Sequence, residues 1–471
     1  MKIIAARIFL LLLLLWMNPL LFAQGGSVQN HLSDSLQSYV AQSHGSWAFT
    51  HAHIIDGSGK VLLEDGTLLI EGSRIRKVGT SDEVAIPEGF EVISCQGKTI
   101  IPGLVGMHNH LHIPGRPDVA SQAAKLYLAS GVTTIQTCGA ADAQRELELS
   151  EQIRSGWSLG PEIIPSAPYV TGPGGNPNMI IPRNDQHLKD TLTYWLSQGV
   201  KWFKVYRNVR TEDLRITLER VHASGGKVRG HLCSVSFREA ALMGIDGIEH
   251  GLNSTADFRS NHVSGLCGGG REYMDELSMD EPRVKDLLST MVEHKVVLTS
   301  TLAVYESSVP NRVYAEEREL NVMSDRLRED FNTRLETAKL QWTDSTRNKR
   351  LERIMAFEYE FVQAGGLLCS GVDAGRHVLP GFGDQRNYLL HLESGFTPLE
   401  AVQIMSANGA RAMERDDIGI LREGARADFV ILDGHLIDDP STIKRVHRVF
   451  QSGIGYNPAL ILESVQGKFG I

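Results

Sequence analysis

Six side chains that can bind a metal ion occur at intervals along the sequence, each at or near the end of a short apolar run. They are His108, His110, Lys204, His231, His250 and Asp373. His108 and His110 are one residue apart, and residues i and i+2 of a strand point to the same face. Paired imidazoles suit a transition metal such as zinc. We therefore predict that these two histidines begin a metal site that the later residues complete.

Lys204 is the least ordinary member of this set. Trp202, Lys204 and Tyr206 alternate along one face of a predicted strand, and apolar residues occupy the other face. If the strand is covered on both faces, the ammonium group must be paired, shifted in pKa or chemically altered. Taken singly, a strand-end histidine is more often structural, and Asp373 could cap a helix. It is the joint occurrence of the six residues, in this order, that favours a site.

The elements that position these residues are alternating strands and helices. From residue 101 to about residue 414, short apolar runs alternate with helical stretches such as 119–130, 213–224, 237–243 and 284–294. About eight such units favour an α/β fold, a (β/α)8 TIM-like barrel, with its chemistry at the carboxyl ends of the strands. Residues 311–353 form a long, charged helical insertion, either a solvated helix or a lid.

The two ends of the chain resemble each other in their short strands and turn residues. Residues 47–100 and 415–471 predict one small, discontinuous β-sandwich domain, into which the barrel of residues 101–414 is inserted. Residues 24–46 are polar and predict a linker. Residues 1–23 carry early positive charges, an apolar run and a final small residue, the pattern of a signal peptide. We therefore expect a secreted or periplasmic protein without stable membrane insertion after cleavage.

Composition narrows the classes of molecule that the protein is expected to bind. The chain has 471 residues, 22% charged residues and a net charge of -9, with no basic patch that would suit a nucleic acid. Its five cysteines are scattered and odd in number, so they predict no disulfide framework. One pair could still form a bridge, and the sequence does not say which. A small-molecule substrate is the expected partner, and homo-oligomerisation stays open.

The pattern resembles the metal-dependent amidohydrolase superfamily, and most of all its branch of imidazolonepropionase-like proteins and Xaa-Pro or Xaa-Arg dipeptidases. The motifs that carry the resemblance are Pro102-Gly103-Leu104 before the paired histidines, Gly131-Val132-Thr133-Thr134, Lys204-Val205-Tyr206, Gly230-His231, Ile248-Glu249-His250-Gly251, Gly371-Val372-Asp373-Ala374-Gly375, Thr397-Pro398-Leu399-Glu400-Ala401 and Gly424-Ala425-Arg426-Ala427-Asp428-Phe429-Val430. Together they span nearly all of the chain that follows the predicted linker.

The resemblance implies a binuclear centre with two divalent ions, most often zinc. His108 and His110 would bind the more buried ion with Asp373, and His231 and His250 the more exposed one. Lys204 would react with carbon dioxide to give a carbamate that bridges both ions.

The implied activity is that of an exported amidohydrolase that cleaves a C–N amide bond, peptide-like or in an N-acyl amino acid, by metal-activated hydroxide. Asp373 would move the proton to the leaving amine, and a dipeptidase is the nearest reaction. Tyr206 is a candidate to donate a hydrogen bond to the carbonyl oxygen or to a substrate carboxylate. Arg207 and Arg376 are candidates to bind that carboxylate.

Departures from the superfamily pattern leave alternatives open. Gly106 stands where an Asp is common, His112 is an additional histidine, and the residues after Lys204 lack the glycines of prolidase-like members. Lactone, ester or cyclic-amide hydrolysis would use the same site. Deamination is disfavoured because no acidic residue follows His231 closely. The non-enzyme alternative is a metal-free binding protein on the same barrel.

Overall fold

The computed structural model describes most of the chain, namely residues 32–112, 119–309, 311–312, 315–341, 344–375 and 378–470. The predicted signal peptide (1–23) lies outside these residues, and so does Arg376. Among the helices of the described ranges, none is both long enough and apolar enough to cross a membrane.

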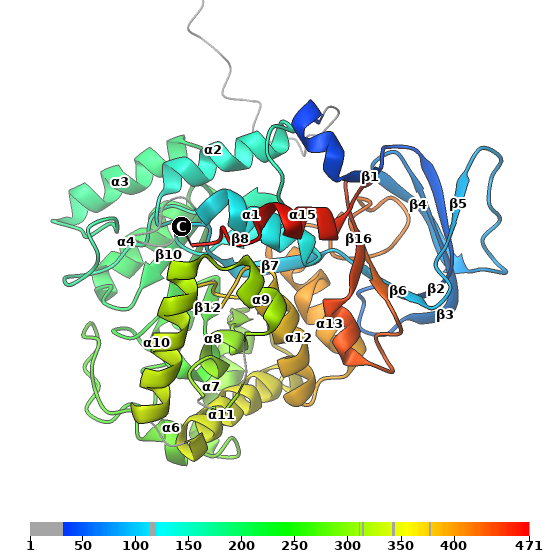
Figure 1. Cartoon of the computed structure of the whole chain (residues 1–471). Helices are drawn as coiled ribbons and strands as arrows, with labels where there is room; N and C mark the ends of the chain where they lie inside the picture. The colour runs from blue at the N-terminus through cyan, green and yellow to red at the C-terminus, as the bar shows by residue number, and fades with distance from the viewer. Residues whose placement is uncertain are drawn as a thin grey trace, which may run out of the picture.

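One nine-stranded sheet joins the two ends of the chain, as the blue and orange-red strands at the right of Figure 1 show. Its order is β1-β17-β16-β15-β6-β2-β3-β4, with β5 paired to β2. β15 runs antiparallel to β6 and pairs Ile431 with Ile100. The strands are β1 (Val40–Gln42), β2 (Ser46–Ile55), β3 (Leu62–Glu71), β4 (Arg74–Thr80), β5 (Glu91–Ser94), β6 (Lys98–Pro102), β15 (Phe429–Asp433), β16 (Val446–Gln451) and β17 (Ile454–Tyr456).

This sheet folds over on itself. The ring of Phe49 on β2 lies 5.2 Å from that of Phe429 on β15 and 5.0 Å from that of Phe450 on β16. Three strand spacings separate β2 from β16 in the sheet order, about 14 Å in a flat sheet. The sheet must therefore curl around these buried rings. The apolar core predicted for a β-sandwich is present, but one continuous sheet encloses it, not two separate sheets.

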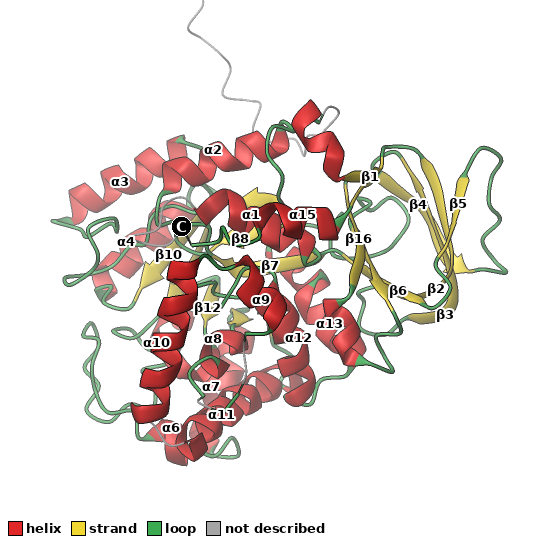
Figure 2. Ribbon diagram, viewed as in Figure 1, coloured by secondary structure: helices red, strands yellow, loops and turns green. Residues whose placement is uncertain are grey.

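The parallel strands hold the candidate site. Among the described residues they form a three-stranded sheet, β7-β8-β9, and a five-stranded sheet, β10-β11-β12-β13-β14. Their bounds are β7 (Leu104–Asn109), β8 (Val132–Thr137), β9 (Glu162–Ile164), β10 (Trp202–Tyr206), β11 (Lys227–His231), β12 (Gly247–Glu249), β13 (Val297–Ser300) and β14 (Leu367–Ser370). Figure 2 shows helices around these strands. The predicted mixed α/β fold with parallel strands is confirmed.

Backbone hydrogen bonds connect the edges of the two parallel sheets. The N–H of Val170, in the segment after β9, donates to the carbonyl of Lys204 at 2.8 Å, and the N–H of Tyr206 donates back to Val170 at 2.8 Å. At the opposite edges, the N–H of Asp373 donates to the carbonyl of His108 at 2.9 Å. Sheet pairing in the described ranges does not close the eight strands into one barrel.

The helices alternate with the parallel strands along the chain and agree closely with the predicted helical stretches. The predicted helical stretches correspond to α1, α4, α5 and α7 within two residues at each end, and the 311–353 insertion becomes α9, α10 and part of α11. The helices are α1 (Ala120–Ala129), α2 (Ala143–Arg154), α3 (Asp185–Ser197), α4 (Thr211–His222), α5 (Phe237–Leu242), α6 (Tyr273–Glu276), α7 (Pro282–Glu293), α8 (Leu302–Glu306), α9 (Glu317–Val322), α10 (Asp325–Gln341), α11 (Asp344–Gln363), α12 (Phe382–Glu393), α13 (Pro398–Met405), α14 (Ala407–Ala412) and α15 (Pro458–Val465), with 3-10 helices η2 (Asp34–Tyr39), η4 (Gly251–Ser254) and η5 (Pro440–Lys444).

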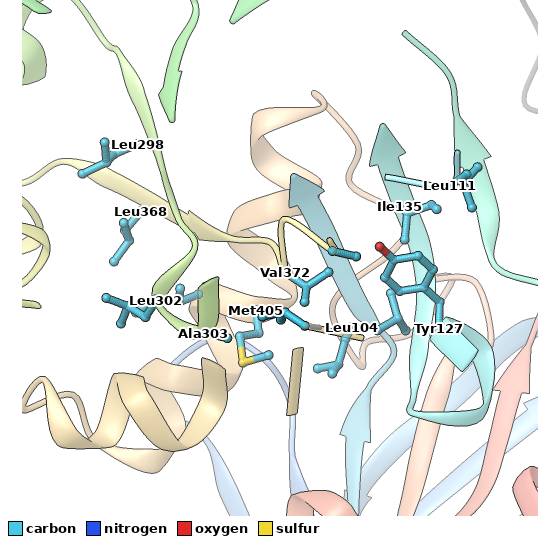
Figure 3. Packing of buried hydrophobic residues seen from close by; sticks show 14 of the residues in the cluster. Leu104, Leu111, Tyr127, Ile135, Leu298, Leu302, Ala303, Leu368, Val372 and Met405 are labelled. Carbon is cyan, nitrogen blue, oxygen red and sulfur yellow. The ribbon is translucent and has the colours of Figure 1, made fainter. Parts of the chain in front are cut away.

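Buried apolar side chains fix the strands that carry the site. Figure 3 shows Leu104 of β7, Ile135 of β8 and Leu368 of β14 in one cluster with Met405 of α13, and all four are buried. Burial of such side chains contributes about 1.5–3 kcal/mol each. These contacts therefore fix β7, β8 and β14 against α13.

The linker predicted for residues 24–46 is not simply extended chain. In its described part, residues 34–39 form η2, and β1 pairs antiparallel with β17 through Val40 and Tyr456. Leu36 is buried and belongs to the main apolar cluster. The reason is that β17 offers an unpaired sheet edge, which a short, weakly patterned segment can still complete.

Candidate metal centre

His108 lies at the centre of the predicted ligands. It is the fifth residue of β7 and fully buried, and its Nδ1 donates to the Glu249 carboxylate at 2.6 Å. Its Nε2 lies 3.1 Å from Nζ of Lys204 and 3.4 Å from Oδ1 of Asp373. A carboxylate on Nδ1 fixes the tautomer and leaves the Nε2 lone pair for a metal ion. Glu249 therefore orients this histidine as a ligand.

His110 and Asp373 lie together at the solvent side of the cluster. His110 Nε2 is 3.0 Å from Asp373 Oδ1. The exposed fraction rises from 0% for the His108 side chain to 13% for His110 and 24% for Asp373. Donor atoms of His108, His110 and Asp373 all lie within 4.8 Å of one another, which is close enough to bind one ion. Asp373 is thus the ligand candidate that a substrate in solution would meet.

Lys204 is buried, as its place on β10 predicts, and only 2% of the residue is exposed. Its Nζ lies 5.2 Å from the ring centre of Tyr169 and 5.8 Å from that of Tyr206. No carboxylate forms an ion pair with Lys204 among the described residues. The ammonium is stabilised only by aromatic faces and a histidine nitrogen, which is weak compensation for burying a charge.

His231 and His250 form the second half of the cluster. Their ring centres are 4.3 Å apart, and the ring of His250 lies 4.6 Å from that of His108. His250 Nδ1 is 2.9 Å from the Thr301 hydroxyl and 3.7 Å from Asp373 Oδ2. His231, the last residue of β11, contacts the ring of Tyr206 at 4.9 Å between centres. All six predicted ligands therefore lie in one continuous cluster.

Two of these residues have a left-handed backbone. His250 has φ +73° and Asp373 has φ +49°, a region that non-glycine residues rarely adopt. Each follows a strand, and each is held by a hydrogen bond from its own N–H, to the carbonyl of Thr299 at 3.0 Å and of His108 at 2.9 Å. Such strain, of order 1–3 kcal/mol each, gathers at functional sites. The sharp turns direct both side chains back toward the histidines.

The predicted substrate-binding residues differ in position. Tyr206 is half-buried, and its ring packs against those of Tyr169 and His231. Arg207 is exposed, with NH2 4.0 Å from Sγ of Cys267, and in the described ranges it makes no hydrogen bond or ion pair with the ligand cluster. Arg376 lies outside the described residues. Only Tyr206 of the three is seen to border the cluster directly.

Sequence reasoning missed two residues that contact the ligands, and a third that contacts one of these two. Tyr169 places its hydroxyl 3.2 Å from Nδ1 of His110. Glu249 contacts His108, and Arg229 donates from Nε to Glu249 at 2.6 Å. Alternation along β11 could have identified Arg229, because it shares a face with His231. Tyr169 lies outside the named strands, in a segment without periodicity that could have singled it out.

The two irregular positions near His108 have structural explanations. A Cβ atom on Gly106 would lie 2.5 Å from Nδ2 of Asn109, so the Asn109 side chain occupies the space an Asp at 106 would need. His112 is buried, and its Nδ1 lies 3.8 Å from Oε1 of Glu146 on α2. His112 thus points toward α2.

The protonation of the cluster tests whether a metal ion would fit. Burial lowers the pKa of His110, and of His231 and His250 far more, so these imidazoles are neutral near pH 7. His108 differs: burial acts to lower its pKa, but the charge of Cys138 and the nearby carboxylates raise it well above its usual range. Neutral imidazoles and a carboxylate are the donors that zinc binds. His110, His231 and His250 therefore offer neutral nitrogens, and the carboxylates that favour a proton on His108 would equally favour a divalent ion in its place.

Comparison with known proteins points the same way. The Amidohydrolase family profile matches residues 371–454, which include Asp373. A dihydroorotase of Wolbachia sp. subsp. Brugia malayi is 39% identical over 92 residues, 19% of this chain and 20% of that protein. An imidazolonepropionase of Paenarthrobacter aurescens is 32% identical over 96 residues, 20% of this chain and 22% of that protein. The chain thus spans about a fifth of the length of the curated relatives it matches.

The sequence likeness to the Amidohydrolase family thus covers residues 371–454, near the end of the chain. Solved structures extend the likeness in fold to most of the chain. A candidate prolidase from Bifidobacterium longum has a TM-score of 0.67 at 22% identity, covering 90% of this chain and 100% of that one. A Xaa-Pro dipeptidase with bound methionine in its active site has a TM-score of 0.66 at 16% identity, covering 88% of this chain and 100% of that one. At these identities the likeness concerns the fold alone.

Proposed function

We propose that this protein is a metal-dependent hydrolase of C–N amide bonds in peptide-like or N-acyl amino acid substrates. The observation that carries the proposal is the convergence of six ligand-type side chains, from five strand ends, on one buried cluster. Two divalent ions, zinc being the nearest choice, would polarise a carbonyl group and lower the pKa of bound water. His108, His110 and Asp373 would hold one ion, and His231 and His250 the other.

Asp373 is the group we propose to move the proton. Although burial acts to raise it, His108 and His110 hold the pKa of Asp373 well below its usual range. The group is therefore a carboxylate, and 24% of its side chain is exposed, against 13% for His110 and 0% for His108. An Asp373 oxygen would accept a proton from the attacking water and return it to the leaving amine nitrogen.

Two tyrosines would orient the substrate. Tyr206 and Tyr169 lie on the same side of Lys204, with ring centres 5.3 Å apart. We propose that the Tyr206 hydroxyl donates to the substrate carbonyl oxygen or to its carboxylate, while the Tyr169 hydroxyl stays on His110 Nδ1. Hydrogen-bond donors placed before reaction stabilise developing negative charge without reorganising.

Lys204 would become an anionic ligand. The ammonium would lose one proton, and the free amine would add to carbon dioxide and release a second proton, so that a carbamate with two oxygen donors replaces the buried positive charge beside His108. The physical reason is that a carbamate whose negative charge is balanced by metal ions avoids the desolvation cost of an isolated ammonium.

The test is a substrate screen with metal analysis. Purified protein, loaded with zinc in the presence of bicarbonate, would be assayed on dipeptides, N-acyl amino acids, cyclic amides and lactones. The proposal expects about two metal ions per chain and turnover of an open-chain amide. Lys204→Ala should lose more than about 100-fold in kcat/KM and lose metal, since even second-layer changes cost 10–100-fold. Near-normal metal content and activity in this variant would refute the bridge.

Cyclic-amide hydrolysis is the second candidate. It is favoured by the curated relatives, which include a dihydroorotase and an imidazolonepropionase. The same site would serve it, with Asp373 protonating a ring nitrogen. Turnover of cyclic amides with no open-chain activity would decide for this candidate. Absence of metal and of activity after re-metallation would instead favour a binding protein.

We also propose an arrangement for the whole chain. The two parallel sheets would be arcs of one (β/α)8 barrel (101–414), a reading supported by the backbone hydrogen bonds at both of their junctions. The curled sheet (47–100 and 415–471) would form the second domain. Export through cleavage of residues 1–23 is the matching proposal for location, tested by N-terminal sequencing of protein recovered from the culture fluid or periplasm.

A further inference from the structure

The segment that follows His250 is tied to the end of the neighbouring strand. Cys267 in this segment forms a disulfide with Cys233, which lies two residues after His231. The N–H of Gly265 also donates to the carbonyl of Ser234 at 2.7 Å. Residues 251–272, named here the tethered loop, therefore have a fixed position beside two ligand-bearing strand ends.

Three arginines meet at the tethered loop. Arg207, at the end of β10, has its guanidinium 4.0 Å from Cys267 Sγ. Arg271 donates from NH2 to the carbonyl oxygen and to Oδ1 of Asn253, at 2.8 and 2.6 Å. Arg259 donates from Nε to the carbonyl of Thr255 at 3.0 Å. Two of the three are thus positioned by neutral oxygens.

Acidic side chains in the same loop are engaged elsewhere. Asp257 accepts hydrogen bonds from the backbone N–H groups of Phe237 and Arg238, at 2.7 and 3.1 Å. Glu272 accepts from the Ser260 hydroxyl at 3.0 Å. In the described part of the chain, Arg207, Arg259 and Arg271 have no ion-pair partner, although the whole chain carries a net charge of -9. Gathering three cations that form no ion pair costs free energy that a bound anion would recover.

The arginines also lie within electrostatic reach of the candidate centre. Asn253 follows His250 by three residues, and the ring of Tyr305 lies 6.0 Å from that of His250. Burial and Asp373 raise the pKa of Tyr305 well above its usual range, and Arg271 acts against them. Arg207 directly follows Tyr206, whose ring centre lies 4.9 Å from that of the ligand candidate His231. Burial lowers the pKa of Arg259, and Arg271 and Arg207 lower it further.

We propose that Arg207, Arg259 and Arg271 bind a second carboxylate on the leaving-group side of the substrate. The substrate would then release an acidic amino acid, as a Xaa-Glu or Xaa-Asp dipeptide or an N-acyl glutamate does. A guanidinium pairs with one carboxylate through two parallel hydrogen bonds, so three guanidiniums exceed the need of a single α-carboxylate. This inference rests on the proposed amide hydrolysis and names its substrate class.

Matched substrates test the inference. Zinc-loaded enzyme would be assayed with N-acetyl-L-glutamate and N-acetyl-L-glutamine, and with Ala-Glu and Ala-Gln, which differ only in one charge. We expect kcat/KM to favour the glutamate member at least tenfold, mainly through KM, and 0.5 M salt to reduce that ratio. Arg271→Gln and Arg259→Gln should each lower the ratio at least tenfold. Arg271→Lys keeps the positive charge but loses the paired N–H donors of the guanidinium, so it should lower the glutamate-to-glutamine ratio by less than Arg271→Gln does.

A control and a binding measurement separate the possible failures. Arg215→Gln removes an exposed arginine of α4 that pairs with Glu212 and Glu219, and its ratio should stay that of the wild type. Isothermal titration with L-glutamate and L-glutamine should show at least tenfold tighter binding of glutamate, lost in Arg271→Gln protein that retains its disulfide and unfolding temperature.

Hydrolysis without any preference for the charged substrates would overturn this inference and leave the proposed function standing. Arg271-dependent binding of glutamate without hydrolysis would overturn the proposed function and support the anion site. Equal binding of the two amino acids would overturn the anion site whatever the activity.

Discussion

Replacement of Glu249 by Gln is the sharpest test of the interior of the site. The carboxylate accepts from Nδ1 of His108 and from Nε of Arg229, each at 2.6 Å, and all three side chains are at most 2% exposed. Gln offers one acceptor oxygen for these two donors, so its NH2 group must face an N–H. One charge-assisted hydrogen bond, about 1.5–3 kcal/mol, is lost. The Arg229 charge is also left buried without a partner, which brings the expected cost to about 3–5 kcal/mol.

The measurement is urea unfolding of metal-free protein, combined with zinc affinity from chelator competition. Affinity should fall about 10–100-fold, because His108 loses the group that fixes its tautomer. The double variant Glu249→Gln/Arg229→Met removes the stranded charge and should recover at least about 2 kcal/mol of the loss. A single-variant cost below about 1 kcal/mol, or strictly additive effects in the cycle, would refute the reasoning.

Three further perturbations test other parts of the structure. A Cβ on Gly371 would lie 2.3 Å from the backbone nitrogen of His108, so Gly371→Ala should destabilise the fold by at least about 1–3 kcal/mol and reduce bound zinc. Gly375→Ala is the control, because the nearest atom to its Cβ would be 3.8 Å away. Its thermal unfolding temperature should stay close to that of the wild type. Cys267→Ser should cost about 3–4 kcal/mol in urea unfolding, because its disulfide closes a span of 34 residues; peptide mapping that finds no bridge in the wild type would contradict this. Burial raises the pKa of Glu358 to about 8, so the unfolded chain ionises first and stability should fall as the pH rises from 4.5 to about 8. Glu358→Gln should remove that pH dependence, and an unchanged slope would show the assignment to be wrong.

The order of the strands and the identity of the ligand-type residues could be predicted because both depend on local patterns. Lys204 and His231 lie within or at the end of strands, where alternation determines the face. His250 and Asp373 could be named as candidates, but their left-handed backbones, which turn them toward His108, depend on hydrogen bonds to other strands. Sequence periodicity has no information about such turns.

Other features depend on contacts between distant segments and could not be predicted. Tyr169 reaches His110 because the chain after β9 runs alongside β10, through hydrogen bonds of Val170. The choice of Cys233 and Cys267 among five cysteines follows from the position of the tethered loop. By contrast, the Arg229–Glu249 pair was open to prediction, since two charged residues inside apolar strands require each other.

The pairing of β6 with β15 has a consequence for folding during synthesis on the ribosome. β6 ends at Pro102 and its partner begins at Phe429, so the ribosome must add 429 − 102 = 327 residues before that ladder can start to form. At about 5–20 residues per second this takes roughly 15–65 s. During that interval one side of β6 offers unpaired backbone groups and buried-type side chains such as Ile100 to any strand nearby. The nascent chain therefore has a period of exposure to aggregation, and chaperone binding at residues 98–102 is where protection would matter most.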